Sequence, residues 1–183
     1  MNQQKDTQKI TILAVMIALD VILSPILRIE GMAPMSSVIN ILAASFMGPV
    51  YTTIMALVCG IIRMILMGIP PLALTGAVFG AFLAGLGYWK FKSIYAAAIG
   101  EFIGTGIIGS LLSYPIMVWF TGVKTNLHWL IYTPRFMGAC VMGAIAAFVV
   151  YNQLKHVQVF RKLQMMFGLA DESVVENKKY TCN

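Results

Sequence analysis

Long apolar runs, each carrying at most one charged residue, dominate this chain. Residues 93–120 form one such run, with Glu101 inside it, and Arg63 and Arg135 lie inside two others. A run of about 20 apolar residues is long enough to cross a bilayer as a helix. An ionisable side chain at bilayer depth costs at least about 2–3 kcal/mol, so such a residue generally faces a partner, a cavity or a ligand. The pattern predicts a membrane bundle with a polar site in its interior.

The composition favours the same class. The chain is 59% hydrophobic and 11% charged, with a mean hydropathy of +0.82, whereas soluble domains average about 25% charged residues. The net charge of +6 does not indicate a nucleic-acid partner, because the cations stand at the ends of apolar runs rather than on one soluble face. One membrane domain is the natural interpretation.

The apolar runs predict six membrane-spanning helices after a short polar leader at residues 1–9. They are expected at residues 10–27, 36–47, 49–67, 72–89, 93–120 and 129–152. The second is only about 18 Å long as a helix, too short to span unaided. Gly48 and Pro49 signal a turn after it, and Pro115 is expected to kink or end the fifth helix. The predicted fold is an all-α membrane protein, a six-transmembrane-helix bundle.

The basic residues predict that both termini are cytoplasmic, in a multi-pass protein of the cell membrane. In that orientation only Arg28 and Lys124 lie in outer loops, as the excess of cations on the cytoplasmic side requires. The basic residues placed inside are Lys5, Lys9, Lys90, Lys92, Lys155, Arg161 and Lys162.

The segment after the last span predicts a helix lying on the membrane surface. Between about residues 153 and 167, apolar side chains such as Phe160 and Leu163 recur at helical spacing among basic residues, which is typical of an amphipathic interfacial helix. Residues 168–183 are polar and are expected to form a cytoplasmic tail. Residues 1–167 are interpreted as one membrane domain that includes the interfacial helix.

Pairs of small residues four positions apart predict close helix packing. They are Gly76/Gly80, Ala81/Gly85, Gly100/Gly104 and Ala139/Gly143. Such pairs let helix backbones approach closely in lipid, and packing within the bundle is the favoured interpretation. Ala14 and Ala18 form a similar pair in the first helix, which is a weaker signal for a surface that binds a partner.

Four charges inside the apolar runs invite pairing. Asp20 with Arg63 and Glu101 with Arg135 would neutralise them, and so would the exchanged pairs. One interpretation is purely structural ion pairs; the other is that at least one charge faces a ligand. The second is slightly favoured, because replacing a buried ion pair by apolar residues is often neutral or stabilising.

Polar residues near these charges extend the candidate site. Thr105 shares a helix face with Glu101, and Tyr132 shares one with Arg135. Asn40 is an amide inside the short second helix, where an unpaired polar group would be costly. Thr75 begins the fourth helix and is a weaker candidate.

The sequence carries no motif for catalysis or for ATP binding. It has no G-x-x-x-x-G-K-[ST] loop, no H-E-x-x-H and no G-x-S-x-G. Neither histidine has a metal-site neighbourhood. The chain is therefore expected to be no enzyme, to need no cofactor or metal, and to have no ATPase activity of its own.

Several segments together resemble a known family. Residues 35–40 read MSSVIN, Gly48 and Pro49 follow, residues 60–63 read GIIR, and residues 100–105 read GEFIGT. The segment 73–76 reads ALTG and is followed by Gly80 and Ala81. With the Ala14/Ala18 pair, roughly residues 10–152 resemble the substrate-binding S component of an energy-coupling factor (ECF) vitamin transporter, of the thiamine-precursor subfamily ThiW.

The resemblance implies a mechanism and a ligand. An S component captures a vitamin or precursor from outside and docks, through the small face at Ala14 and Ala18, on a transmembrane coupling protein (EcfT-like) driven by two ATPase subunits. For ThiW the implied ligand is hydroxyethylthiazole, the thiazole precursor of thiamine. With Asn40 and Arg63 added from the polarity argument, the candidate substrate-binding residues are Met35, Ser36, Asn40, Arg63, Thr75, Glu101, Thr105, Tyr132 and Arg135.

Two alternatives stay open. The chain could be an S component for another vitamin or precursor, such as hydroxymethylpyrimidine or thiamine. It could also be a non-transport membrane scaffold whose buried charges are purely structural.

Overall fold

The computed structural model describes residues 2–26, 33–69, 71–121 and 133–169, and these residues are helical with short connections. The elements are α1 (Asn2–Ile26), α2 (Pro34–Met67), α3 (Leu72–Phe91), α4 (Ile94–Glu101), the π-helix η1 (Phe102–Gly109), α5 (Ser110–Thr121), α6 (Thr133–Leu154) and α7 (Gln158–Met166). Within these ranges, four helical stretches are long and apolar enough to cross a membrane. The predicted all-α membrane class is confirmed, since the described residues contain no strand.

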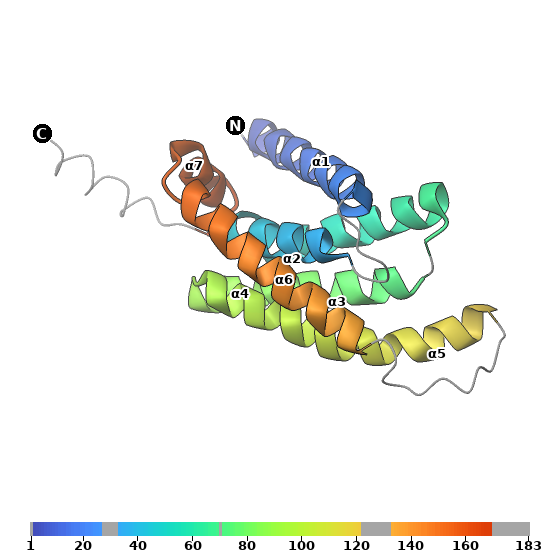
Figure 1. The fold of residues 1–183 in the computed structure, drawn as a ribbon. Helices are drawn as coiled ribbons and strands as arrows, with labels where there is room; N and C mark the ends of the chain where they lie inside the picture. Colours follow the sequence, from blue (N-terminus) through green and yellow to red (C-terminus); the bar gives the residue numbers. More distant parts are fainter. Residues whose placement is uncertain (1, 27–32, 70, 122–132, 170–183) are drawn as a thin grey trace, which may run out of the picture.

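The helices form an elongated bundle with α1 along one flank (Figure 1). α2 packs most extensively against α3, which in turn packs on α4 and η1. α6 crosses the bundle over α2 and η1, and α7 lies at the end of the bundle where α1 begins (Figure 1). We call this the α7 end; the loop between α3 and α4 lies there as well.

A break at Gly48 divides α2 into two arms, residues 34–47 and 49–67. Gly48 has φ 75° and ψ −179°, outside the helical region, and glycine reaches positive φ without the steric cost of a side chain. Pro49 follows with no backbone N–H, so it cannot donate to the carbonyl four residues earlier. The turn predicted at Gly48 and Pro49 is confirmed.

The run at residues 93–120 forms one rod built of α4, η1 and α5. The early end expected at Pro115 is wrong, because α5 continues through Pro115 to Thr121. Backbone groups freed by proline inside a membrane helix can be re-satisfied by neighbouring groups, so proline need not end it. The irregularity is instead the π-helix that starts directly after Glu101, a geometry frequent at functional sites.

The polar leader expected at residues 1–9 is helical, since α1 begins at Asn2 rather than at residue 10. The leader is rich in Gln and Lys, which favour helix without needing an apolar face. Residues 1–9 differ from the following apolar run in polarity, but one helix continues through both from Asn2 to Ile26.

Glycines hold α3 against the α4–η1 rod, as the small-residue pairs predicted. A Cβ on Gly104 would meet the Phe79 carbonyl oxygen and lie 2.7 Å from Gly80 Cα, and one on Gly109 would lie 2.5 Å from Gly76 Cα. In α6, a Cβ on Gly143 would lie 2.7 Å from Ser37 Cβ. These approaches are too close for any larger residue, so the pairs serve packing within the bundle.

Gly104→Ala is expected to destabilise the protein by about 1–3 kcal/mol, the usual cost of overpacking, because two backbones must separate. Gly106 is the matched control: a Cβ there meets Met137 Cγ at an ordinary 3.5 Å. Denaturation by SDS in mixed micelles, followed by circular dichroism, compares the two variants. Equal stability would contradict the role of Gly104.

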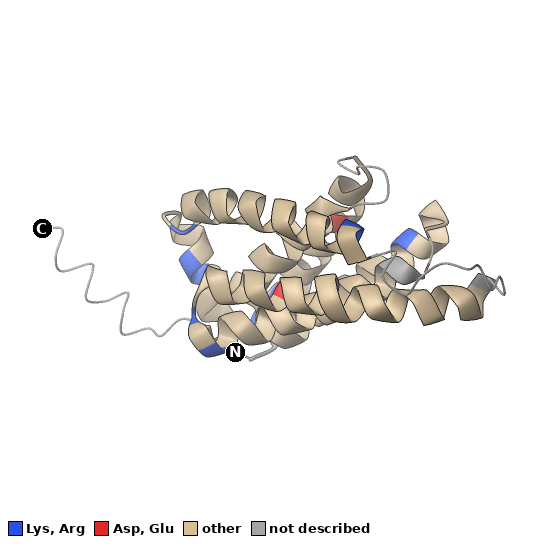
Figure 2. Ribbon diagram, turned by 60° about the horizontal axis from the view of Figure 1, so that its bottom comes forward, with Lys and Arg blue, Asp and Glu red and all other residues tan. Residues whose placement is uncertain are grey.

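Several Lys and Arg residues lie at the α7 end of the bundle, and a few red and blue segments interrupt the tan ribbon between the two ends (Figure 2). Trp89 and Trp119, near the ends of α3 and α5, are exposed, as expected for aromatic residues at a membrane–water interface.

Candidate functional site

A buried polar centre joins three helical elements around Glu101. Glu101, at the end of α4, is 1% exposed, and Asn40, in the first arm of α2, is fully buried. Asn40 Nδ2 donates to Glu101 Oε1 at 3.3 Å and also lies 3.4 Å from the Ala77 carbonyl oxygen of α3. Thr105 Oγ1, in η1, lies 3.0 Å from Glu101 Oε1 and 2.9 Å from the Gly76 carbonyl oxygen. We call Asn40, Glu101 and Thr105 the Glu101 centre.

Glycine at position 80 makes room for this centre. A Cβ on Gly80 would collide with Thr105 Oγ1 and lie 2.6 Å from Glu101 Oε2. The carboxyl therefore occupies space that any other residue at position 80 would fill. Gly80 of α3 therefore leaves space for the Glu101 and Thr105 side chains between α3 and the rod.

Two acceptor atoms near the centre have no partner among the described residues. Asn40 Oδ1 and Ser36 Oγ are buried and make no hydrogen bond. Buried polar atoms are nearly always paired, so each exception needs an explanation. An amide oxygen beside a carboxyl presents acceptors, which suits a ligand that brings hydrogen-bond donors.

Ser37 and Cys140 also belong to this region, and sequence reasoning missed both. Ser37 is among the side chains that act on the Glu101 carboxyl, and its Oγ lies 3.9 Å from Cys140 Sγ. Cys140 Sγ in turn lies 4.0 Å from the Glu101 backbone oxygen. Ser37 stands three residues before Asn40 and therefore on the same helix face, a signal that could have identified it.

Further polar contacts continue along the rod toward the end opposite α7. Ser110 Oγ lies 3.3 Å from Thr133 Oγ1 of α6, and Ser113 Oγ lies 3.2 Å from Thr75 Oγ1 of α3. Ser110 and Ser113 are fully buried. Thr75 therefore lies outside the Glu101 centre and contacts a hydroxyl of the rod instead.

Arg63 belongs to a separate cluster with Asp20, between α1 and the second arm of α2. Ser24 Oγ donates to Asp20 Oδ1 at 2.7 Å, and Cys59 and the Arg63 charge also act on the Asp20 carboxyl. Arg63 is 4% exposed, and its Nε has no hydrogen-bond partner in the part of the chain that the structure describes. Asp20 and Arg63 thus share a neighbourhood, as one of the predicted pairings expects. The Asp20 charge also acts on Glu101, whereas Arg63 is not among the groups that do.

The other candidates lie outside the Glu101 centre. Arg135 is exposed on α6 and is not among the groups acting on Glu101, so the expected contact between them is not found. Met35 is half-buried and Ser36 buried at the start of α2. Tyr132 lies outside the described residues. The described part of the chain contains no group of three His, Cys, Asp or Glu that could hold a metal ion.

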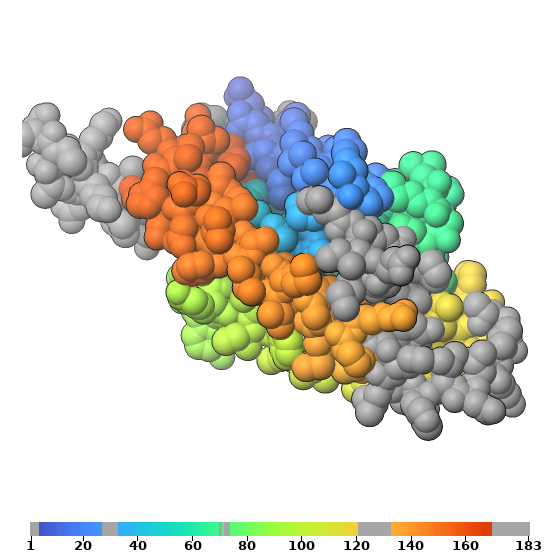
Figure 3. Space-filling model, in the orientation of Figure 1, coloured from blue at the N-terminus to red at the C-terminus, as the bar shows by residue number. Residues whose placement is uncertain are grey.

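The face of α1 that carries Ala14 and Ala18 is exposed. Both alanines are exposed, with Val15 and Leu19 beside them. Figure 3 shows α1 lying along the outside of the bundle. Its opposite side packs on α2, through Leu13 and other apolar residues.

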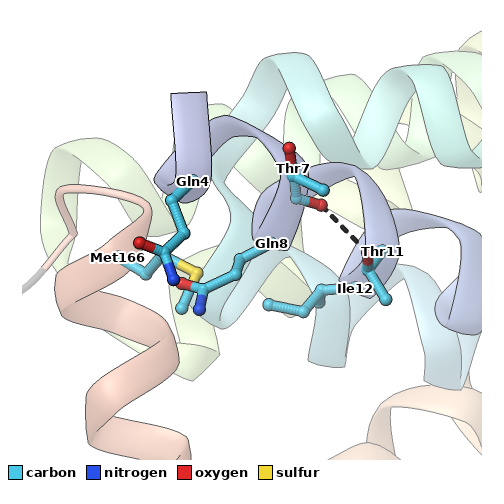
Figure 4. A pocket seen from close by; sticks show the side chains of 6 residues that line it. All are labelled: Gln4, Thr7, Gln8, Thr11, Ile12 and Met166. Atoms are coloured by element: carbon cyan, nitrogen blue, oxygen red, sulfur yellow. Dashed lines mark hydrogen bonds between the residues drawn. The ribbon is translucent and has the colours of Figure 1, made fainter. Parts of the chain in front are cut away.

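A groove of about 630 Å³ lies between the start of α1 and α7, apart from the Glu101 centre. In Figure 4 the side chains of Gln4 and Gln8 extend from α1 toward Met166 of α7. Thr7, Thr11 and Ile12 complete the lining, and Thr11 Oγ1 donates to the Thr7 carbonyl oxygen at 2.9 Å. The groove is open to the outside of the bundle.

The comparisons with known proteins identify one family. Residues 10–157, well over half of the chain, match the family model described as thiamine-precursor transporter protein (ThiW). No curated protein and no solved structure gave a match. The matched range contains α2 to α6 and both polar clusters, so the resemblance to the ThiW family seen in the sequence is confirmed. The chain belongs to the ThiW family of thiamine-precursor transporter proteins, membrane proteins that act in transport.

Proposed function

We propose that this chain is the substrate-binding S component of an ATP-driven ECF importer and that its ligand is hydroxyethylthiazole. The observation that carries the proposal is the Glu101 centre, a buried carboxyl and amide with an unpartnered acceptor, inside a chain of the ThiW family. The hydroxyl of hydroxyethylthiazole would donate to Glu101 or to Asn40 Oδ1. Ser36 and Met35, at the start of the same arm of α2, would line the approach.

The remaining candidates take outer positions in this proposal. Thr75 and Arg135, with Tyr132, would contact the ligand as it enters from the end opposite α7, and Arg63 would contribute from the second arm of α2. The bundle would cross the membrane six times, with α2 supplying two crossings through its break at Gly48. Both termini would be cytoplasmic, which agrees with the basic residues at the α7 end.

Delivery would require partners. The exposed face of α1 at Ala14 and Ala18 would dock on an EcfT-like coupling protein in the plasma membrane, and two ATPase subunits would drive the cycle. Small residues on a lipid-facing helix permit close approach of a partner helix. The chain's own lack of an ATP-binding loop agrees with this division of labour.

A calorimetric and thermal-shift screen of the detergent-purified chain tests the ligand. We expect hydroxyethylthiazole to raise the unfolding temperature, since a ligand that binds only the folded state stabilises it. Selective stabilisation by thiamine would keep the transporter class but reject the thiazole. No response from a chain shown to be folded would favour the membrane scaffold.

Hydroxymethylpyrimidine is the second candidate ligand in this screen. The Glu101 centre offers acceptors in Glu101 and Asn40 Oδ1, and this pyrimidine brings an amino group as well as a hydroxyl. Tighter binding of hydroxymethylpyrimidine than of hydroxyethylthiazole would show that the site prefers the ligand with more hydrogen-bond donors.

A further inference from the structure

At the break in α2 the Ser45 backbone carbonyl lacks its helical donor. In an unbroken helix the Ser45 carbonyl would accept from the N–H of residue 49, but residue 49 is proline. Gln164 of α7 supplies the missing donor: its Nε2 lies 2.9 Å from the Ser45 carbonyl oxygen. The second proton of the amide points to Tyr88 Oη of α3, at 2.8 Å.

α7 contacts both arms of α2 at the break. On the first arm, the Phe160 ring packs edge-to-face on Phe46 at 5.7 Å between centroids. On the second arm, the Phe167 ring lies 5.0 Å from Tyr51. Leu169 lies directly over the break, 3.7 Å from the position of a Cβ on Gly48. These contacts hold the two arms at one angle.

The same helix is tied to α3 and α6. Lys92 Nζ, just after α3, donates to the carbonyl oxygen of Leu169, just after α7, at 2.8 Å. Tyr88 Oη, which accepts from Gln164, also lies 3.3 Å from Tyr151 Oη of α6. Phe160 is 4% exposed and also packs edge-to-face on Tyr151. One side of α7 is therefore part of the bundle, and Gln164 sits at its junction with α2 and α3.

We infer that α7 clamps the break in α2 and that Gln164 is a positioning residue for the ligand site. The first arm ends at the break and carries Ser37 and Asn40, and Asn40 stands less than two helical turns before the carbonyl that Gln164 caps. A change in the direction of this arm moves the Asn40 amide relative to Glu101 and Ala77. α7 lies beyond residues 10–157, the part of the chain that matches the family model.

Gln164→Met tests the clamp, because methionine keeps the length of the side chain and removes both hydrogen bonds. Gln158→Met is the matched control, since Gln158 is an exposed glutamine on the same helix. Amide hydrogen exchange of the ligand-free, full-length chain in detergent is followed by mass spectrometry. We expect Gln164→Met to speed exchange at residues 45–53 and also at residues 36–41, with residues 94–101 and the control variant unchanged.

The effect on binding rests on the proposed function. Titration calorimetry with hydroxyethylthiazole is expected to show a dissociation constant raised about five- to tenfold in Gln164→Met, the scale of one lost hydrogen bond. Unchanged exchange at residues 45–53 would overturn the clamp. Faster exchange confined to residues 45–53, or an unchanged dissociation constant, would overturn the positioning role. If the wild-type chain binds no hydroxyethylthiazole, the proposed ligand fails, while exchange at residues 36–41 still decides the positioning role.

Discussion

Glu101→Gln is expected to weaken the binding of hydroxyethylthiazole about 10- to 100-fold while the chain stays folded. The amide has the shape of the carboxyl and its oxygen still accepts from Asn40 and Thr105, so the packing against Gly80 persists. The variant removes the carboxylate, one of the two acceptors proposed for the ligand hydroxyl, and a hydrogen bond to a charged group is worth about 1.5–3 kcal/mol. Titration calorimetry measures the affinity, and thermal unfolding of the same samples measures stability.

Asp20→Asn is the matched control, because Asp20 is the other buried acid and belongs to the cluster with Ser24 and Arg63. Because the Asp20 charge also acts on the Glu101 carboxyl, Asp20→Asn is expected to change the dissociation constant much less than Glu101→Gln does. If Glu101 is instead purely structural, Glu101→Gln lowers the unfolding temperature and leaves the affinity intact. A loss of stability without loss of binding would remove Glu101 from the ligand site and leave it a structural role.

The membrane class, the break at Gly48 and the glycine packing could be predicted from the sequence because each has a local cause. Apolar length predicts a helix that crosses lipid, a Gly-Pro pair breaks it, and small residues mark close approach. The placement of Asn40 and Thr105 beside Glu101 also follows in part, since Thr105 shares a helix face with Glu101 and Asn40 needed a partner.

The partners of the charges could not be predicted, because they depend on how the helices rotate about their axes. Four charges allow two neutral pairings, and the sequence alone does not choose between them. The structure places Arg63 in the neighbourhood of Asp20 and leaves Arg135 exposed, while Glu101 is surrounded by an amide and hydroxyls. The π-helix and the contact of Gln164 with Ser45 were likewise invisible, since both arise from tertiary packing.

Ala18→Trp is expected to abolish uptake of the ligand by cells that carry the complete importer, while the purified chain still binds it. Ala18 lies on the exposed face of α1, away from the Glu101 centre. An indole there would hold a partner helix away from the small face through which the chain is proposed to dock. Uptake of radiolabelled hydroxyethylthiazole measures transport, and calorimetry on the purified variant measures binding. Ala14→Trp should behave in the same way.

Ala146→Trp separates docking from a general effect of a large residue in the membrane. Ala146 is an exposed alanine on α6, so the substitution places the same indole on another outer face of the bundle. It should leave both uptake and binding unchanged. Normal uptake by Ala14→Trp and Ala18→Trp would remove the docking surface from α1. Loss of uptake in all three variants would mean that any bulky residue on the outer surface blocks transport, and the small face would then have no special role.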